Sequence, residues 1–156
     1  MLKLHYDRRS VFAALAAVAV VAPVRAEPLP EVAVTKDPSC GCCDAWVVHL
    51  REAGFRASVT EGPVNPLKRK LGVPRALASC HTAQVSRYVI EGHVPAPAIK
   101  RLLAERPEGI GLAVPGMPVG SPGMEVEGTE PDTYEVILFG RSDRRTFARY
   151  RGSKEV

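Results

Sequence analysis

Cys40-Gly41-Cys42-Cys43 is the stretch that decides how this chain folds. It follows the short apolar run Val32-Ala33-Val34 and precedes Asp44-Ala-Trp-Val-Val-His-Leu50, whose apolar residues are spaced as in a helix. The three segments together predict a strand, a tight turn and a helix that begins with thiols. A single disulfide uses two cysteines and leaves the third over, so the motif indicates either a metal site or thiol exchange.

The helix predicted after this turn carries the cysteines at its first turn. Its apolar residues recur at helical spacing, and they are Cys43, Trp46, Val47, Leu50 and Ala53. Gly54 is a helix-ending residue, and His49 lies off the apolar stripe and is expected to be solvated. Because backbone N–H groups point outward at the start of a helix and its dipole is positive there, a cysteine at that end loses its proton more readily. The resulting thiolate is both a nucleophile and a metal ligand.

The first 26 residues have the organisation of a secretory signal peptide. Basic residues lie within Met1–Ser10, Val11–Ala22 is an unbroken apolar run too short to span a bilayer comfortably, and Val24-x-Ala26 is a small-residue cleavage pattern. We therefore expect residues 1–26 to be removed and residues 27–156 to form one domain in the periplasm. An uncleaved membrane anchor is the alternative interpretation.

The mature chain is nearly neutral. Residues 1–26 hold four of the 21 basic residues and one of the 17 acidic residues, which leaves 17 and 16. Nothing in this balance argues for nucleic acid or an anionic membrane as a partner. About 130 residues can bury a core without disulfides. The four cysteines are therefore free for chemistry, in a compartment that oxidises thiols unless they are bound or actively reduced.

The remaining segments predict the order strand, helix, strand, helix, strand, strand, helix. Strands are expected at 32–34, 55–60, 75–82 and 87–90, and helices at 43–53, at 65–71 and from Pro97 to Arg106. This is the order of the thioredoxin and glutaredoxin folds, so we expect an α/β fold with a mixed sheet and flanking helices. In those folds a proline just before the third strand is cis and faces the cysteine turn. Pro74 occupies that position here, and a trans proline in an ordinary turn is the alternative.

Three residues outside the cysteine turn are further candidate metal ligands. Cys80 and His81 lie in the third predicted strand, where neighbouring side chains point to opposite faces. Both can face one pocket only if the strand bulges or ends there. His93 is predicted to lie on a turn and to be exposed enough to coordinate. A buried inert thiol, a structural imidazole and a solvated loop histidine are the corresponding alternatives without function.

A glycine-rich tract, residues 108–131, is too apolar for a disordered linker. Pro-Gly-Met occurs in it twice, and Pro-Gly fits the central positions of a type II turn, so Met117 and Met124 follow two rigid bends. A thioether is a soft ligand that favours Cu(I), so we expect the tract to fold over the cysteines as a lid with at least one methionine on the metal. Packing in a hydrophobic gap is the alternative. A hairpin, 134–139 with 146–150, is predicted to extend the sheet.

These motifs together resemble the periplasmic CopG proteins of bacterial copper- and silver-resistance clusters. The resemblance is carried by segments 36–43, 79–82, 91–95 and 111–125 together with Trp46. It implies a thioredoxin-like fold and copper binding at the Cys-x-Cys-Cys turn with the distant Cys80. It suggests storage of toxic copper or a redox reaction on it, with copper-handling proteins or a thiol reductant as partners. Four soft ligands exceed what one centre needs, so we expect more than one Cu(I) per chain.

Two other functions fit the same cysteines. A metal-free thiol oxidoreductase would attack with Cys40 and resolve with Cys43, and it would leave Cys42 and the methionine bends without a function. A structural zinc site fits the cysteine count, but adjacent cysteines strain a single tetrahedral centre and suit bridging between Cu(I) ions better. Metal analysis of the purified protein separates the three.

Overall fold

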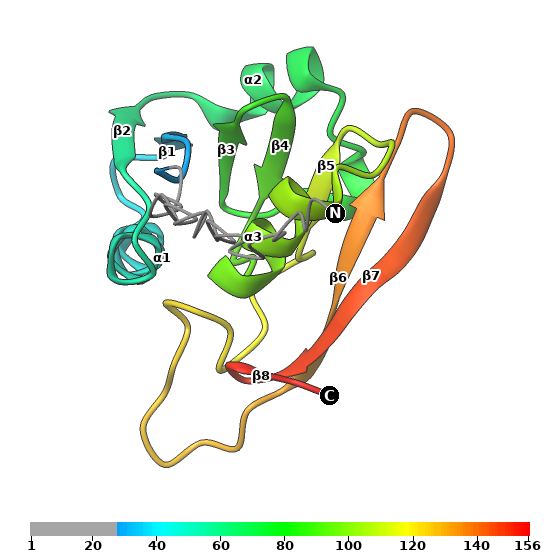
Figure 1. The fold of residues 1–156 in the computed structure, drawn as a ribbon. Helices are drawn as coiled ribbons and strands as arrows, with labels where there is room; N and C mark the ends of the chain where they lie inside the picture. The colour runs from blue at the N-terminus through cyan, green and yellow to red at the C-terminus, as the bar shows by residue number, and fades with distance from the viewer. Residues whose placement is uncertain (1–27) are drawn as a thin grey trace, which may run out of the picture.

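The computed structural model describes residues 28–156 and has an α/β fold built on one mixed sheet (Figure 1). The predicted signal peptide lies outside the described residues. The elements in chain order are β1 (Val32–Lys36), α1 (Gly41–Glu52), β2 (Ala57–Glu61), α2 (Val64–Leu71), a 3₁₀ turn (Arg75–Leu77), β3 (His81–Val85), β4 (Tyr88–Glu91), α3 (Ala96–Glu105), β5 (Gly111–Ala113), β6 (Thr133–Phe139), β7 (Arg144–Arg151) and β8 (Lys154–Glu155). The order of the first four strands and three helices agrees with the thioredoxin-like order predicted from the sequence.

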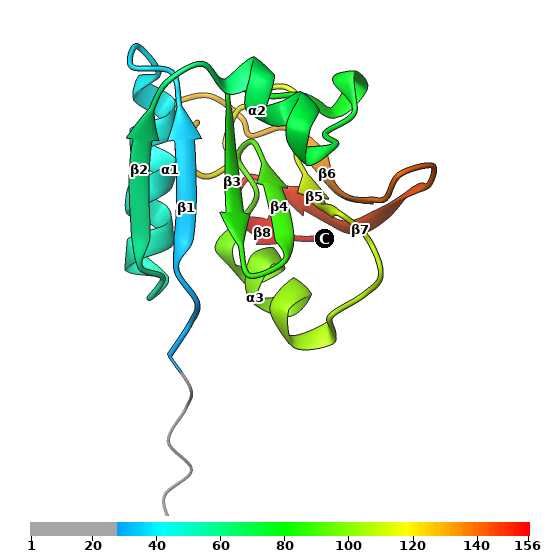
Figure 2. The same ribbon diagram turned by 90° about the horizontal axis from the view of Figure 1, so that it is seen from above.

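The sheet has eight strands in the order β2-β1-β3-β4-β5-β6-β7-β8. β1 is parallel to β2 and antiparallel to β3, β4 is parallel to β5, and every other neighbouring pair is antiparallel. In the register of β1 with β3, Lys36 lies opposite His81 and Val32 lies opposite Val85. The end of β1, where the cysteine turn begins, is therefore beside the start of β3 (Figure 2).

Two apolar clusters divide between the two faces of the sheet. Ile90 and Leu112 belong to the main core, which also contains the apolar faces of α1 and α3. Their neighbours Val89 and Ala113 point the other way, as strand alternation requires, and belong to a smaller cluster with Leu77. In Figure 1, α1 and α3 accordingly lie on the opposite side of the strands from α2. None of the helices in residues 28–156 combines the length and apolar composition needed to cross a membrane.

The predicted terminal hairpin is present as β6 and β7. β6 pairs with β5, so the hairpin extends the sheet as expected. It also closes the main core, because Val136, Leu138 and Tyr150 are buried there. The strand pair is therefore part of the hydrophobic core as well as an extension of the sheet.

The prediction for the third strand and its proline was wrong. Residues 75–77 form a 3₁₀ turn and β3 begins only at His81. Pro74 therefore lies well before β3, and no peptide bond in the described residues is cis. Its neighbours Val73 and Leu77 pack in the smaller cluster, on the face away from α1. The physical reason is composition: residues 75–80 contain no β-branched or aromatic side chain, whereas β3 itself carries Thr82 and Val85.

Two helix boundaries also differ from the sequence prediction. α2 begins at Val64 after Pro63, one residue before the predicted Asn65 N-cap. It ends as predicted at Gly72, which has a φ of +76° that favours glycine. α3 begins at Ala96, one residue before the predicted Pro97, and its last residue is Glu105, with Arg106 as a left-handed C-cap before Pro107. Helix ends are the positions where sequence patterns are least restrictive.

Candidate metal centre

The turn between β1 and α1 is built by Asp37. Its Oδ1 accepts hydrogen bonds from the Ser39 hydroxyl at 2.6 Å and the Ser39 N–H at 2.9 Å, and these bonds lower the pKa of the Asp37 carboxyl. The Cys40 N–H donates to the Asp37 carbonyl at 3.0 Å. Cys40 is thereby placed as the N-cap of α1, and no side chain caps that helix end. The cysteines therefore lie where backbone N–H groups are exposed to a thiolate.

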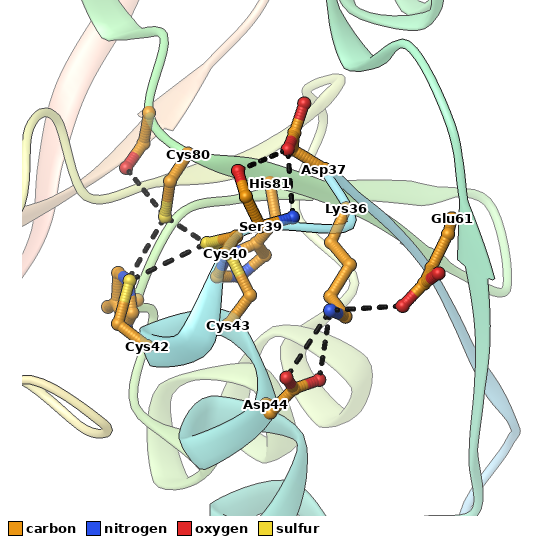
Figure 3. The surroundings of a disulfide bond; sticks show 12 residues. Lys36, Asp37, Ser39, Cys40, Cys42, Cys43, Asp44, Glu61, Cys80 and His81 are labelled. Atoms are coloured by element: carbon orange, nitrogen blue, oxygen red, sulfur yellow. Dashed lines mark hydrogen bonds and ion pairs between the residues drawn. A yellow bond between two sulfur atoms is a disulfide. The ribbon is translucent and has the colours of Figure 1, made fainter.

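A buried lysine ties the cysteine turn to the sheet. Lys36, the last residue of β1, is 3% exposed and its Nζ lies 3.2 Å from an oxygen of Asp44 and 3.4 Å from one of Glu61 (Figure 3). Asp44 is in the first turn of α1 and Glu61 ends β2. The ion pairs therefore join the helix that carries the cysteines to two strands.

The four predicted cysteines converge, as expected, into one cluster, called here the cysteine cluster: Cys40, Cys42, Cys43 and Cys80. All four sulfur atoms lie within 4.8 Å of one another. Cys40 and Cys43 form a disulfide, and Cys42 and Cys80 are free thiols (Figure 3). The Sγ atoms of Cys40 and Cys42 are 3.6 Å apart. The arrangement brings a Cys-x-x-Cys pair and two further thiols to one point.

Cys80 is shared with a second donor group that contains both predicted histidines. Its Sγ lies 3.1 Å from His93 Nε2 and 3.3 Å from His81 Nδ1. Cys80 and His81 can face the same pocket because β3 starts at His81, which meets the condition set by strand alternation. His93 is fully buried, so the expectation that it is exposed was wrong. The fold covers the turn after β4, which sequence alone presented as a surface turn.

The protonation of His93 follows from its hydrogen bonds. Its Nδ1 lies 2.8 Å from the carbonyl oxygen of Pro122. A carbonyl can only accept, so Nδ1 carries the proton and Nε2 keeps its lone pair. Burial lowers the pKa of His93, which also favours this neutral form. Nε2 therefore accepts from the Cys80 thiol, and a metal ion could take the place of that proton.

His81 is fully buried and has an unpartnered nitrogen. Its ring lies 4.3 Å from the Trp46 ring and 5.0 Å from the His93 ring, measured between centroids. Burial lowers the pKa of His81 to about 3, and the charge of Lys68 lowers it as well. Its Nε2 is buried without a hydrogen-bond partner. A buried polar atom without a partner is costly, and here it belongs to a neutral imidazole beside a thiol.

Cys80 keeps its proton when no metal is bound. Burial and the neighbouring Cys42 raise the pKa of the Cys80 thiol to about 11. A metal ion that binds the sulfur must therefore displace a proton, and its affinity should rise with pH. Once the Cys40–Cys43 disulfide is reduced, the two donor groups together offer four cysteine sulfurs and two neutral imidazoles, a soft donor set that fits copper better than calcium or magnesium.

The glycine-rich tract packs against the centre. A Cβ on Gly123 would lie 2.7 Å from the backbone nitrogen of Trp46 and 2.9 Å from the backbone oxygen of Cys42, so the tract touches the first turn of α1. The Ser79 hydroxyl donates to the Gly116 carbonyl beside Cys80. These contacts agree with the expected cover over the cysteines, and Figure 1 shows the loop between β5 and β6 passing close to α1.

Neither predicted methionine ligand is tested by these contacts. The Met117 side chain is 54% exposed and that of Met124 is half-buried. Metal coordination by either methionine remains a prediction.

Sequence reasoning missed three groups near the centre. His49 is half-buried rather than solvated, and its Nε2 accepts the Ala96 N–H at the start of α3 at 3.0 Å. Lys68 and Glu91 form a buried ion pair that contacts the segment around Cys80. The only sequence signal for the pair was an acid inside the apolar strand β4, and its partner lies 23 residues away.

Comparisons with known proteins place these features in a family context. Residues 77–124 match a family model described as "Protein of unknown function, DUF411". Two solved structures are similar, "Copper resistance protein copG" Form 1 and Form 2. Form 1 is 43% identical over 81% of this chain and 100% of its own, with a TM-score of 0.74. Form 2 is 44% identical over 80% of this chain and 99% of its own, with a TM-score of 0.73. A comparison with curated protein sequences finds no match.

Proposed function

This chain belongs to the family of the copper resistance protein CopG, and we propose that it is a periplasmic protein that binds several Cu(I) ions at its cysteine cluster. The observation that carries the proposal is the position of Cys80, which is shared between the four-sulfur group and the group formed with His81 and His93. One thiolate in two donor groups can bridge two ions. Neutral imidazoles add donors without adding negative charge.

A titration of the reduced protein with Cu(I) under anaerobic conditions tests the proposal. We expect more than one equivalent per chain to bind, and Cys80→Ser to lower the number, because it removes the shared donor. His49→Gln is the matched control, since His49 caps α3 and belongs to neither donor group. Saturation of the wild-type protein at a single equivalent, or a Cys80→Ser variant with unchanged stoichiometry, would contradict the proposal.

The disulfide supports a redox reaction on copper as part of the same function. Oxidation of the Cys40 and Cys43 thiols to their disulfide releases two electrons and two protons, which can reduce two Cu(II) ions to Cu(I). Reduced protein mixed with excess Cu(II) without oxygen should then yield two Cu(I), measured with a Cu(I)-specific chelator, for each Cys40–Cys43 disulfide formed. The double variant Cys42→Ser, Cys80→Ser keeps only the Cys40 and Cys43 thiols and should still yield two Cu(I) per disulfide, and a loss of this yield would exclude the pair as the electron source.

The same disulfide favours a second candidate function, metal-free thiol–disulfide exchange. The Cys40 thiolate would attack a substrate disulfide, and Cys43 would then resolve the mixed disulfide and release the substrate as two thiols. Reduction of a model disulfide by copper-free protein, at a rate that copper does not enhance, would favour this candidate over copper binding.

The export of the protein is also part of the proposal. The N-terminal pattern of residues 1–26 supports cleavage near Glu27 and a periplasmic location. The mass of the protein recovered from a periplasmic extract should correspond to a chain that begins near residue 27. A full-length mass in the membrane fraction would favour the anchor.

A further inference from the structure

We propose that a buried network of Lys68, Thr82 and Glu91 positions Cys80 and His93 so that they can bind copper together with Cys42. This inference rests on the proposed copper site. None of the three residues belongs to either donor group. They act, in this view, through the backbone on both sides of Cys80 and through the turn that carries His93.

Glu91 is the centre of the network. It is the last residue of β4, it is fully buried, and both of its carboxylate oxygens accept hydrogen bonds. Oε1 accepts from Lys68 Nζ at 2.5 Å and from the Ser79 N–H at 2.6 Å, and Oε2 accepts from the Thr82 hydroxyl at 2.7 Å. One carboxylate therefore fixes the backbone immediately before Cys80 and a side chain two residues after it.

Lys68 holds the residues that follow Cys80 by hydrogen bonds. It is 5% exposed, and its Nζ also donates to the His81 carbonyl at 3.3 Å and to the Thr82 hydroxyl at 2.8 Å. Lys68 lies on α2, so the network ties α2 to the start of β3 and the end of β4. The Cys80 backbone is thereby held from both neighbouring residues by one ion pair.

The turn that carries His93 is attached to the same point. His93 lies two residues after Glu91, and the intervening Gly92 donates its N–H to the His81 carbonyl at 3.2 Å. Gly92 has a φ of +72°, and a Cβ there would lie 2.6 Å from the Ser79 hydroxyl oxygen. The segment around Cys80 and the turn that carries His93 are therefore in direct contact. Glu91 accepts a hydrogen bond from the first of these segments and directly precedes the second in the chain.

A contribution to the stability of the fold does not by itself explain why this ion pair is buried. Removing two charges from water is costly, and replacing a buried ion pair by apolar side chains of similar size is often neutral or stabilising. Apolar side chains would nevertheless leave the Ser79 N–H without its present partner, and the backbone beside Cys80 could shift. Partners that orient metal ligands from outside the donor set commonly change metal affinity by about 10- to 100-fold when they are mutated.

The double variant Lys68→Met, Glu91→Leu separates positioning from stability because it removes both charges at once. We expect a thermal midpoint at or near that of the wild type and a Cu(I) affinity, measured by competition with a chromophoric chelator, that is about 10- to 100-fold lower. Thr82→Val should lower the affinity in the same direction, whereas Thr82→Ser keeps the hydroxyl and should bind as the wild type does. Leu102→Ala, in the main core on α3, is the control for a general loss of stability.

A copper-free measurement keeps this inference independent of the proposed function. In a Cys40→Ser, Cys43→Ser background only the Cys42 and Cys80 thiols remain, and their sulfurs lie within 4.8 Å. Diamide should couple them to a disulfide, and the double network variant should slow this coupling by about tenfold or more, because small misplacements of reacting atoms cost large rate factors. If the wild type binds no copper, the proposed function fails while this test still stands. Unchanged coupling and affinity in the network variants, or an equal loss in Leu102→Ala, would overturn the positioning assignment.

Discussion

His81 loses all contact with water when the chain folds, and its protonation is decided by that burial. Burial lowers its pKa to about 3, far below the usual 6.5 of an unfolded chain. The unfolded state therefore binds more protons than the folded state between these two pH values. It follows that the free energy of unfolding falls as the pH is lowered from 6.5 towards 3. His93 and His49, whose pKa values are also lowered by burial, act in the same direction.

We predict that His81→Gln reduces this pH dependence in the copper-free protein. One histidine contributes a slope of at most about 1.4 kcal/mol per pH unit. Urea unfolding at pH steps between 5 and 6.5 measures the slope in a range where most carboxylates stay ionised. The variant should lose part of the slope, and equal slopes in the two proteins would mean that His81 is protonated in the folded state.

At the scale of elements, the glycine-rich tract is attached to α1 at one bend and open at the other. Gly116 and Gly123 both follow a proline and both have positive φ values, +71° and +84°. A Cβ on Gly116 would meet nothing within 4 Å, whereas one on Gly123 would collide with backbone atoms of α1. Both positions require a positive φ, and only Gly123 also lies against the backbone of α1.

This pair gives a matched test of the attachment. Gly116→Ala should lower the free energy of unfolding by about 1 kcal/mol through backbone strain alone. Gly123→Ala should lower it by about 2 to 4 kcal/mol, because the collision adds to the strain. Chemical unfolding of both variants measures the difference. Equal losses would show that the tract is not packed against α1 in solution.

The methionines of the tract require a separate test. We predict that Met117→Leu combined with Met124→Leu keeps the stability within about 1.5 kcal/mol, since the volumes are similar. The same variant should bind Cu(I) more weakly and allow faster oxidation of the bound copper by air, if at least one thioether is a ligand. Chelator competition and the rate of Cu(I) loss measure these effects. Unchanged affinity and oxidation would assign both methionines to packing.

At the scale of the whole molecule, the core continues past the metal centre into the C-terminal hairpin. Val136, Leu138 and Tyr150 are buried in the same cluster as Trp46 of α1. β5, which has only three residues, is held between β4 and β6. The centre therefore rests on a sheet that is complete only when the last 24 residues have paired.

We predict that a chain ending at Asp132 loses cooperative unfolding, because it exposes one side of the main core and an edge of β5. A chain ending at Gly152 is the control, since it removes β8, whose two residues are exposed, and surface ion pairs are worth at most about 1 kcal/mol. Circular dichroism during heating compares the two truncations. A cooperative transition in the shorter chain would show that the first five strands are stable alone.

Much of the fold could be predicted from the chain because its signals are local. The apolar run before Cys40, the helical spacing after it and Gly72 at the end of α2 each depend on residues a few positions apart. The same is true of the terminal hairpin. Residue type and local spacing also identified the candidate ligands. Thiols that lie close together in the sequence usually serve as metal ligands, redox pairs or disulfides.

Only the tertiary structure decided how those ligands meet. The cluster depends on the pairing of β1 with β3, which brings Cys80 across to residues 40–43. The hydrogen bond between His93 and the Pro122 carbonyl, which sets the tautomer, joins residues 29 positions apart, and the Lys68–Glu91 pair joins residues 23 positions apart. The burial of His93 likewise depends on distant segments. Such contacts leave no periodic signal in the sequence, because strand register and loop packing are set by the whole core. Residue types and their spacing therefore established what the centre is made of, and long-range packing established where its atoms lie.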